Sequence, residues 1–256
     1  MARNTPIFTG VGVALVTIFD DTGTVDIGAT ADHARRLIEA GVAAVVVAGS
    51  TGEADTLDDD ERLALLRGVR QALPPDVPVV AGTGAPWAGA AARRTAAAAR
   101  AGADGVLVLS PRRVEDPRAY YAEVAAAASG VPVLAYHFPA VSPPGIPVAM
   151  LAELAVDGVK DSSGDPQRLL ETMDAFEGAV YVGSSALLSF AGPLGATGAI
   201  LAAANLEPAL AVKAFAGDVD AQRSLLPAHL AAARDFPRGL KAALAEQVGT
   251  SPVIRQ

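Results

Sequence analysis

Eight short apolar runs recur along the 256-residue chain, and seven of them are followed by a segment with a different, helical pattern. Most runs are continuous in Val, Ala, Leu and Ile rather than alternating, which is typical of strands buried on both faces of a parallel sheet. We therefore expect eight parallel strands, over Gly10–Thr17, Val42–Gly49, Val77–Gly84, Asp104–Pro111, Val131–Phe138, Asp157–Ser163, Ala179–Ser185 and Gly198–Asn205.

The segments between the runs repeat their apolar residues at helical spacing. In the first of them Ala34, Leu37 and Ile38 share one face, and charged residues occupy the other. Prolines near four of the segment starts suit a first helical turn. The predicted helices are Ile27–Ala40, Asp58–Ala72, Ala88–Ala101, Pro117–Ala128, Pro147–Ala155, Pro166–Phe176 and Pro208–Ala216.

This alternation predicts an α/β fold. Gly41, Gly102 and Gly195 each lie between a helical pattern and an apolar run. Glycine is common there because many helices end with a residue in the left-handed backbone conformation. Eight strand–helix units fit a (β/α)8 TIM barrel with a short C-terminal helical extension. An open doubly wound sheet is the alternative, but no G-x-G-x-x-G follows the first run. We expect a single domain, 1–256, with the barrel at about 8–217 and two further helices at about 218–250, outside the barrel.

The composition excludes several classes of function. A net charge of −8 argues against nucleic-acid and anionic-membrane partners. The absence of cysteine excludes disulfides, thiolate metal sites and cysteine nucleophiles. The N-terminal segment 1–6 lacks the apolar run of a signal peptide, and no uncharged apolar stretch is long enough to span a membrane. We therefore expect a soluble, cytoplasmic protein.

Lysine is scarce in this chain, so the position of each lysine is informative. Only three of the 20 basic residues are lysines, namely Lys160, Lys213 and Lys241. Lys160 lies near the end of the sixth run, and active sites of (β/α)8 barrels lie at the C-terminal strand ends. Arginine keeps its proton, whereas lysine becomes an amine nucleophile when burial lowers its pKa from about 10.4 by about 3 units. Lys160 is therefore the candidate nucleophile.

Other polar groups gather at the same strand ends. Gly49 ends the second run and Ser50 and Thr51 follow it, and Gly183 and Ser184 lie near the end of the seventh. Tyr136 lies near the end of the fifth run. No cluster of His and carboxylates with metal-ligand spacing joins them, so covalent amine catalysis is favoured over metal-assisted hydrolysis, and we expect no metal and no cofactor.

Four motifs, in this order, resemble the dihydrodipicolinate synthase / N-acetylneuraminate lyase family. They are Gly49–Glu53 (GSTGE), Tyr136-x-x-Pro139, Gly158–Gly164 (GVKDSSG) and Gly183-Ser184, within a similarity that runs from Gly10 to about Leu244. The resemblance implies a class I, Schiff-base aldolase or lyase barrel whose substrates are pyruvate, or another 2-keto acid, and an aldehyde. It also implies a homo-oligomer, a tetramer or dimer.

The resemblance assigns roles to individual residues. Lys160 matches the imine-forming lysine, and Tyr136 matches the tyrosine that shuttles protons near the imine and the acceptor oxygen. Ser50 and Thr51 match the hydroxyl pair that holds the keto-acid carboxylate, with Thr51 relaying protons to Tyr136. Gly49, Gly183 and Ser184 fall in the matching substrate-binding motifs. Glu53 is expected to be a structural partner of backbone N–H groups.

The acceptor half of the matching site departs from the family pattern. The synthase carries an arginine where this chain has Val141, and a tyrosine pair where it has Arg112-Arg113. His137 stands where asparagine is common, although alternation along the strand puts it opposite Tyr136. The candidates for the acceptor side are therefore His137, Arg112, Arg113, Ser185 and Asn205.

These departures favour a carbon–carbon or carbon–oxygen lyase that acts on a 2-keto-3-deoxy sugar acid or a related aldol. The first alternative is a 4-hydroxy-tetrahydrodipicolinate (dihydrodipicolinate) synthase. A non-catalytic barrel that binds a keto acid is an alternative of another class. A phosphate-handling isomerase is a third, but it would want a glycine-rich phosphate site after the seventh and eighth strands, and the matches there are weak.

Overall fold

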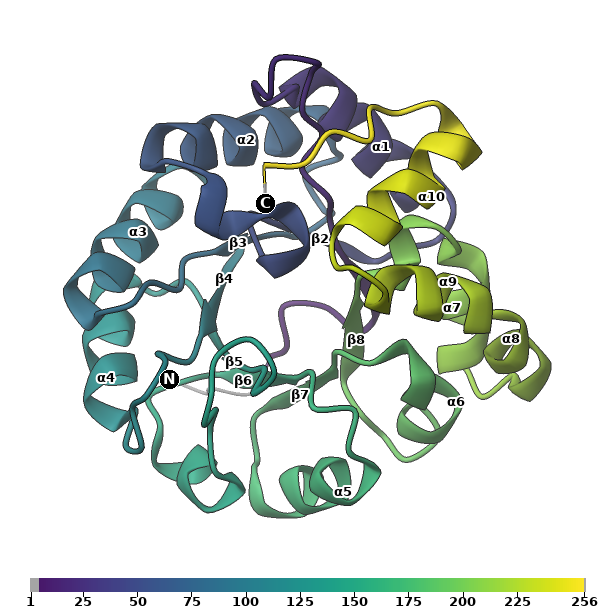
Figure 1. Cartoon of the computed structure of the whole chain (residues 1–256). Coiled ribbons are helices and arrows are strands. Elements are labelled where there is room, and N and C mark those ends of the chain that lie inside the picture. Colours follow the sequence, from purple (N-terminus) through teal and green to yellow (C-terminus); the bar gives the residue numbers. More distant parts are fainter. Residues whose placement is uncertain (1–4, 256) are drawn as a thin grey trace.

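The computed structural model describes residues 5–255, so the first four residues of the segment examined for a signal peptide lie outside it. Eight parallel strands close into a barrel in chain order, which confirms the predicted (β/α)8 fold (Figure 1). The strands are β1 Gly10–Ala14, β2 Ala44–Val47, β3 Val79–Gly82, β4 Gly105–Leu109, β5 Val133–His137, β6 Gly158–Asp161, β7 Ala179–Val182 and β8 Gly198–Leu201.

Helices surround the barrel. The α-helices are α1 Ile27–Glu39, α2 Asp59–Ala72, α3 Ala88–Arg100, α4 Arg118–Ala127, α5 Pro166–Ala175, α6 Leu188–Ala191, α7 Pro208–Phe215, α8 Val219–Ser224, α9 Leu226–Ala233 and α10 Arg238–Val248. Short 3-10 turns follow several strands or precede a strand: η1 Ser50–Gly52, η2 Ala54–Thr56, η3 Val148–Glu153, η4 Ser185–Leu187 and η5 Ala203–Asn205. Within residues 5–255, no helix has the length and apolar character needed to cross a bilayer.

Local sequence signals set the helix ends. Asp58 accepts the Glu61 N–H at 2.8 Å, and the Glu61 carboxylate accepts the Asp58 N–H at 3.1 Å, which forms a capping box at the start of α2. The backbone φ angles of Gly41, Gly102 and Gly195 are 98°, 92° and 92°, as predicted for left-handed helix ends.

Three elements differ from the prediction. The expected helix at Pro147–Ala155 is the 3-10 turn η3, and its packed residues Val148, Leu151 and Leu154 lie three apart, the period of a 3-10 helix. The four-residue helix α6 between β7 and β8 is too short to leave a periodic pattern. The C-terminal extension contains three helices, α8, α9 and α10, instead of two.

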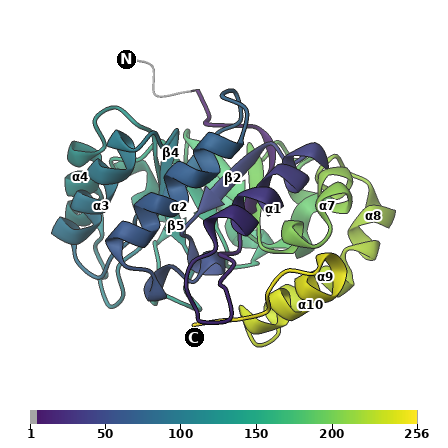
Figure 2. The same cartoon turned by 90° about the horizontal axis from the view of Figure 1, so that it is seen from above.

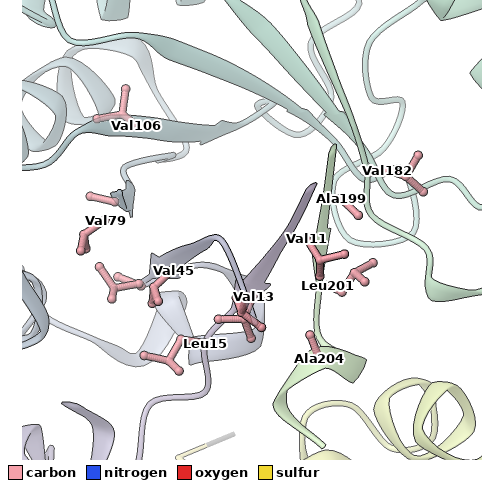
Figure 3. Packing of buried hydrophobic residues seen from close by; sticks show 14 of the residues in the cluster. Val11, Val13, Leu15, Val45, Val79, Val106, Val182, Ala199, Leu201 and Ala204 are labelled. Atoms are coloured by element: carbon pink, nitrogen blue, oxygen red, sulfur yellow. The ribbon is translucent and has the colours of Figure 1, made fainter. Parts of the chain in front are cut away.

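Both faces of the strands are buried, as their continuous apolar runs require. The outer layer lies between strands and helices, and Figure 3 shows part of it, including Val13, Val45, Val79, Val106 and Val182. The inner cluster fills the barrel with Val46, Val80, Leu107, Leu134, Tyr181 and Ile200. The interior is therefore a packed apolar core with an open end, and not a pore.

The C-terminal extension covers one end of the barrel. Figure 2 shows α9 and α10 together on one side of the strands. Helix α9 contacts η4 and η5, which follow β7 and β8, so these helices lie at the C-terminal ends of the strands. The extension is therefore on the face where the candidate site residues gather.

Candidate active site

Lys160 lies inside the open end of the barrel. The register of the sheet pairs Lys160 on β6 with Tyr136 on β5 and with Tyr181 on β7. The lysine is only 4% exposed, and its Nζ lies 4.2 Å from the centroid of the Tyr136 ring. Burial lowers the pKa of Lys160 to about 7. Near neutral pH about half of these amines are therefore uncharged, against roughly one in a thousand for a solvated lysine.

Tyr136 is the proton-bearing group beside this amine. Burial raises the pKa of Tyr136 to about 12, and hydrogen bonds with the Ser162 and Ser50 hydroxyls moderate the rise. The phenol therefore stays protonated at neutral pH and is held by two hydroxyl partners. Its ring stacks on Phe138, with centroids 5.7 Å apart. An uncharged amine beside a fixed phenol is suited to forming an imine and moving a proton.

The loop after β2 presents two hydroxyls at the same end of the barrel. Its backbone is closed by hydrogen bonds from Gly52 N–H and Ala54 N–H to the Gly49 carbonyl, at 3.0 and 3.2 Å. Ser50, rather than Thr51, is bonded to Tyr136, which differs from the expected relay through Thr51. Within residues 5–255 the Thr51 hydroxyl has no hydrogen-bond partner, so it is available to a ligand.

Close packing joins the ends of β6 and β7. A Cβ added to Gly183 would overlap the Ser162 hydroxyl and lie 2.9 Å from the Asp161 carbonyl oxygen, so only glycine fits here. Ser184 caps the following turn, with its hydroxyl accepting the Ala186 N–H at 3.4 Å. Ser162 was missed as a site residue, although it lies two positions after Lys160 and alternation places it on the same face.

His137 lies behind the strand rather than in the site. Its Nδ1 accepts the Ile146 N–H at 2.8 Å, and burial lowers its pKa to about 4, so it is a neutral acceptor that anchors the loop after β5. The neighbouring Asp161 also points outward, as expected, and pairs with Arg168 at 2.7 Å. This placement corrects the expected acceptor-side role of His137, because its side chain faces the helix layer.

Ser185 and Asn205 are engaged elsewhere as well. The Ser185 hydroxyl bonds to Nδ1 of His229 on α9 at 2.9 Å. The Asn205 side chain accepts the Val16 N–H at 3.2 Å and donates to the Ala14 carbonyl at 2.8 Å, and it is 2% exposed. Both residues therefore hold the extension and β1 in place, which corrects their expected contact with substrate.

Arg112 and Arg113 lie at the rim and are exposed. The Arg112 guanidinium donates to the Val141 carbonyl at 2.8 Å, and the Arg113 N–H donates to the Pro143 carbonyl at 2.8 Å. These bonds join the loops after β4 and β5. The arginines thus remain at the edge of the mouth, next to the position where the family pattern has an arginine and this chain has Val141.

Glu53 ends the loop that carries Ser50 and Thr51. It is fully buried, and one carboxylate oxygen accepts the Arg255 N–H at 2.8 Å, in line with the expected structural role. The other oxygen lies 2.6 Å from Nζ of Lys241, a partner 188 residues away that the sequence did not indicate. Within the described part of the chain, no group of three or more His, Cys, Asp or Glu residues is arranged to hold a metal ion.

Solved structures resemble this chain over almost its whole length. A prophage protein of the dihydrodipicolinic acid synthase family from E. coli K12, solved with pyruvate, superposes with a TM-score of 0.89 at 28% identity, over 97% of this chain and 92% of its own. A monomeric dihydrodipicolinate synthase variant superposes with a TM-score of 0.88 at 25% identity, over 97% and 90%.

Sequence relatives give the same assignment. A 4-hydroxy-tetrahydrodipicolinate synthase from Synechococcus sp. (strain WH7803) is 36% identical over 203 residues, which cover 75% of this chain and 67% of its own. A synthase of the same name from Natronomonas pharaonis is 37% identical over 235 residues, covering 85% and 79%. The sequence pattern of the Dihydrodipicolinate synthetase family matches residues 7–249. The chain therefore belongs to the dihydrodipicolinate synthetase family and is a pyruvate-dependent lyase of the class I aldolase type.

Proposed function

We propose that Lys160 is the amine that forms an imine with the 2-keto group of pyruvate. The observation that carries this proposal is the pairing of Lys160 with Tyr136, in which a desolvated amine with a pKa of about 7 lies against a phenol held by two hydroxyls. Desolvation keeps a useful share of the amine uncharged, and the neighbouring phenol can exchange a proton with a bound substrate.

The reaction follows from this chemistry. The uncharged Lys160 amine adds to C2 of pyruvate, and the resulting hydroxyl takes a proton from Tyr136 and leaves as water to give an iminium ion. The Tyr136 phenolate takes a proton from C3, and the C–H electron pair moves toward the iminium nitrogen to form an enamine. The enamine carbon then bonds to the aldehyde carbon of the acceptor, and the aldehyde oxygen takes the proton back from Tyr136. Water finally hydrolyses the iminium ion, which restores the lysine and returns a proton to Tyr136, and cleavage runs through the same steps in reverse.

The loop after β2 would hold the pyruvate carboxylate. Ser50 and Thr51 present hydroxyls and backbone N–H groups at the same end of the barrel as Lys160, and Gly49 starts the turn. Hydrogen bonds to a carboxylate are charge-assisted and orient the keto carbon toward the amine. In this proposal Thr51 binds the carboxylate, Ser50 orients the Tyr136 phenol, and Gly183 and Ser184 complete the wall opposite the loop.

For the second substrate, the comparisons support 4-hydroxy-tetrahydrodipicolinate synthase better than the sugar-acid lyase expected from the sequence, because both cited sequence relatives carry the synthase name. One observation keeps the sugar-acid aldol as the second candidate. The loop after β5 carries Val141 where the synthase pattern has an arginine, and the nearby cations are the exposed Arg112 and Arg113.

Reductive trapping tests the role of Lys160. Borohydride added with pyruvate should leave a reduced pyruvyl adduct on the peptide that contains Lys160, read by mass spectrometry, and Lys160→Arg should leave none. Lys213→Met, which changes an exposed lysine on α7, should be trapped like the wild type. Pyruvate binding without any adduct would favour the non-catalytic barrel, and an adduct on Lys213 or Lys241 would reject the assignment.

An acceptor panel tests the second substrate. The untrapped enzyme should be assayed with pyruvate plus the acceptor of the synthase, and separately for release of pyruvate from 2-keto-3-deoxy sugar acids. The trapped enzyme serves as the inactive control in both assays. Turnover of the synthase acceptor with the higher kcat/KM supports the first candidate. Faster cleavage of a sugar acid would establish the second and remove the first.

Tyr136→Phe should separate imine formation from the later proton transfer. We expect turnover to fall by about 10²–10⁴-fold, the range for removal of a general acid–base group. Borohydride trapping of pyruvate on Lys160 should persist, because the amine remains buried beside an aromatic ring. Steady-state kinetics combined with trapping yield measures both. A turnover within a few-fold of wild type would remove Tyr136 from the mechanism.

The pH dependence should follow the lysine. Because the pKa of Lys160 lies at about 7, kcat/KM for pyruvate should fall about tenfold per pH unit below pH 7 and level off above it. Tyr136, with a pKa of about 12, should add no falling limb up to pH 10. Initial rates between pH 5 and 10 test this profile. A midpoint near the ordinary lysine pKa would show that the amine is solvated.

We propose that the chain works as a homo-oligomer, a tetramer or a dimer. Two large apolar residues on α9, Leu226 and Leu230, are 54% and 48% exposed and lie one helical turn apart, a feature that suits a subunit contact. The similar monomeric synthase variant means that the family does not fix the assembly. Sedimentation equilibrium of the wild type and of Leu226→Glu tests the proposal, and a monomeric wild type would reject it.

A further inference from the structure

A buried ion pair lies directly behind the proposed carboxylate-binding loop. Glu53 follows Thr51 by two residues and adopts a left-handed backbone with φ of 54°. Its carboxylate is 0% exposed and lies 2.6 Å from the ammonium of Lys241, which is 1% exposed and sits on α10. The Glu53 N–H also donates to the Ser50 carbonyl at 3.2 Å, so the position of Glu53 and the shape of the loop are linked.

The segment after α10 completes this arrangement. We call residues 250–255 the C-terminal strap; Figure 1 shows it in yellow, running from α10 toward the centre of the barrel. The Arg255 N–H donates to the second oxygen of Glu53 at 2.8 Å, and Lys241 donates to the Val253 carbonyl at 2.6 Å. The Glu53 carboxylate thus receives one bond from the extension and one from the strap.

The far end of the strap is fastened independently of Glu53. The Arg255 guanidinium makes two bonds to Glu61 on α2, at 2.6 and 2.8 Å, and one to the Gly23 carbonyl at 2.6 Å. Lys241 and Arg255 also lie over the Phe19 ring, 4.1 and 4.5 Å from its centroid. The strap is therefore tied to the loops after β1 and β2 and not to α10 alone.

We propose that Lys241 and the C-terminal strap are positioning elements for the Ser50–Thr51 loop, acting through Glu53 to set it for the carboxylate of the keto-acid substrate. This inference rests on the proposed function, because it takes Ser50 and Thr51 as the carboxylate site. Lys241 and Arg255 do not touch the substrate, and their effect passes through the Glu53 side chain to the turn that presents the two hydroxyls.

The chemistry of the pair supports positioning over simple stabilisation. A buried ion pair is often no more stabilising than apolar side chains of similar volume, whereas it fixes one geometry. A carboxylate held on both oxygens fixes the end of the turn in position and orientation. Displacements of about 1 Å in groups that orient a substrate lower rates by about 100-fold, so a small shift of this turn has a measurable effect.

The test uses full-length variants and pyruvate as the probe. Glu53→Gln/Lys241→Met removes both charges together, so no buried charge is left without a partner. Arg255→Ala removes the guanidinium ties of the strap to Glu61 and Gly23. Lys213→Met is the matched control, a lysine-to-methionine change on an exposed helix face. For each, the pyruvate concentration that gives half-maximal borohydride trapping on Lys160 is measured, along with kcat and the KM of the acceptor.

We expect the half-maximal pyruvate concentration to rise by about 10- to 100-fold in the double variant and by a smaller factor in Arg255→Ala, in line with the sensitivity of catalysis to misplaced groups. The final trapping yield and the acceptor KM should stay near wild type, because Lys160 and the acceptor side are untouched. A general loss of folded enzyme would instead lower the yield without moving the half-maximal concentration.

Several results would overturn this inference. A folded double variant whose half-maximal pyruvate concentration stays within about twofold of the wild type removes the link, since a misplaced positioning group has a larger effect. If the double variant does not fold, Arg255→Ala decides in the same way. A wild type that forms no adduct on Lys160 at all would reject the proposed function itself, so the two failures are distinct.

Discussion

A Lys160→Met variant is expected to form no imine with pyruvate and yet to resist unfolding better than the wild type at pH 7. The native site holds an amine whose pKa burial lowers from 10.5 to about 7. In the unfolded chain the amine has its ordinary pKa and is protonated at pH 7, whereas burial in the native state favours the uncharged form. This pKa difference lowers the free energy of unfolding by about 5 kcal/mol at any pH low enough for the amine to be protonated in both states.

The pH range of this effect follows from the sign of the shift. Between pH 7 and about 10 the unfolded chain binds more protons than the native chain, so the free energy of unfolding of the wild type rises with pH across this window. Below pH 7 the full penalty applies. Methionine carries no charge and fills a similar volume, so the variant should gain about 4 kcal/mol at pH 7, and its advantage should shrink toward pH 10.

Urea unfolding of both proteins at pH 6, 7, 8.5 and 10 measures the difference. Lys213→Met serves as the control, because an exposed lysine should leave the free energy of unfolding unchanged at every pH. A stability gain for Lys160→Met that does not vary with pH would mean that burial of the amine is not its cause. A loss of stability at pH 7 would mean that the wild-type amine is well solvated or paired.

The arrangement of the barrel was predictable because one physical signal runs through the whole chain. Each strand is buried on both faces, so its sequence is an uninterrupted apolar run, and all eight observed strands fall inside the predicted runs. The ends of elements were less well defined. The segment at 147–155 begins with proline like a helix, but its packed residues Val148, Leu151 and Leu154 lie three apart, a spacing that suits a 3-10 turn.

Positions within the site were predictable where strand alternation still applies. Tyr136 and Lys160 lie on strands, so the period of two places both inside the barrel and His137 and Asp161 outside it. Ser185 and Asn205 follow the strand ends, where the chain has already turned into η4 and η5 and the period is lost. The polar character of these two residues alone therefore did not predict which way their side chains point.

The partner of Glu53 was beyond reach of any local pattern. Lys241 lies 188 residues away on a helix of the extension, and its burial depends on how that extension folds back over the barrel. The scarcity of lysine was the one sequence feature that could have drawn attention to Lys241. Two of the three lysines are almost fully buried, at 4% and 1% exposure, while Lys213 is exposed.

Lys241→Met should be the most destabilising single substitution proposed for this chain. Among residues 5–255 it leaves the buried Glu53 carboxylate with the Arg255 N–H as its one hydrogen-bond partner, and breaking one half of a buried ion pair costs about 3–5 kcal/mol. A variant weakened this far should unfold at much lower urea concentration, or accumulate poorly at 37 °C, since the net stability of a domain is about 5–15 kcal/mol.

Adding Glu53→Gln to Lys241→Met should recover most of this loss, because a neutral amide can still accept the Arg255 N–H and no charge remains buried. Urea unfolding of the two single variants and the double variant forms a complete cycle with the wild type. If the double variant is as unstable as Lys241→Met alone, the loss comes from the other contacts of the ammonium, with the Val253 carbonyl and the Phe19 ring, and not from the unpaired carboxylate. In that case these contacts, rather than the ion pair with Glu53, would hold the extension on the barrel.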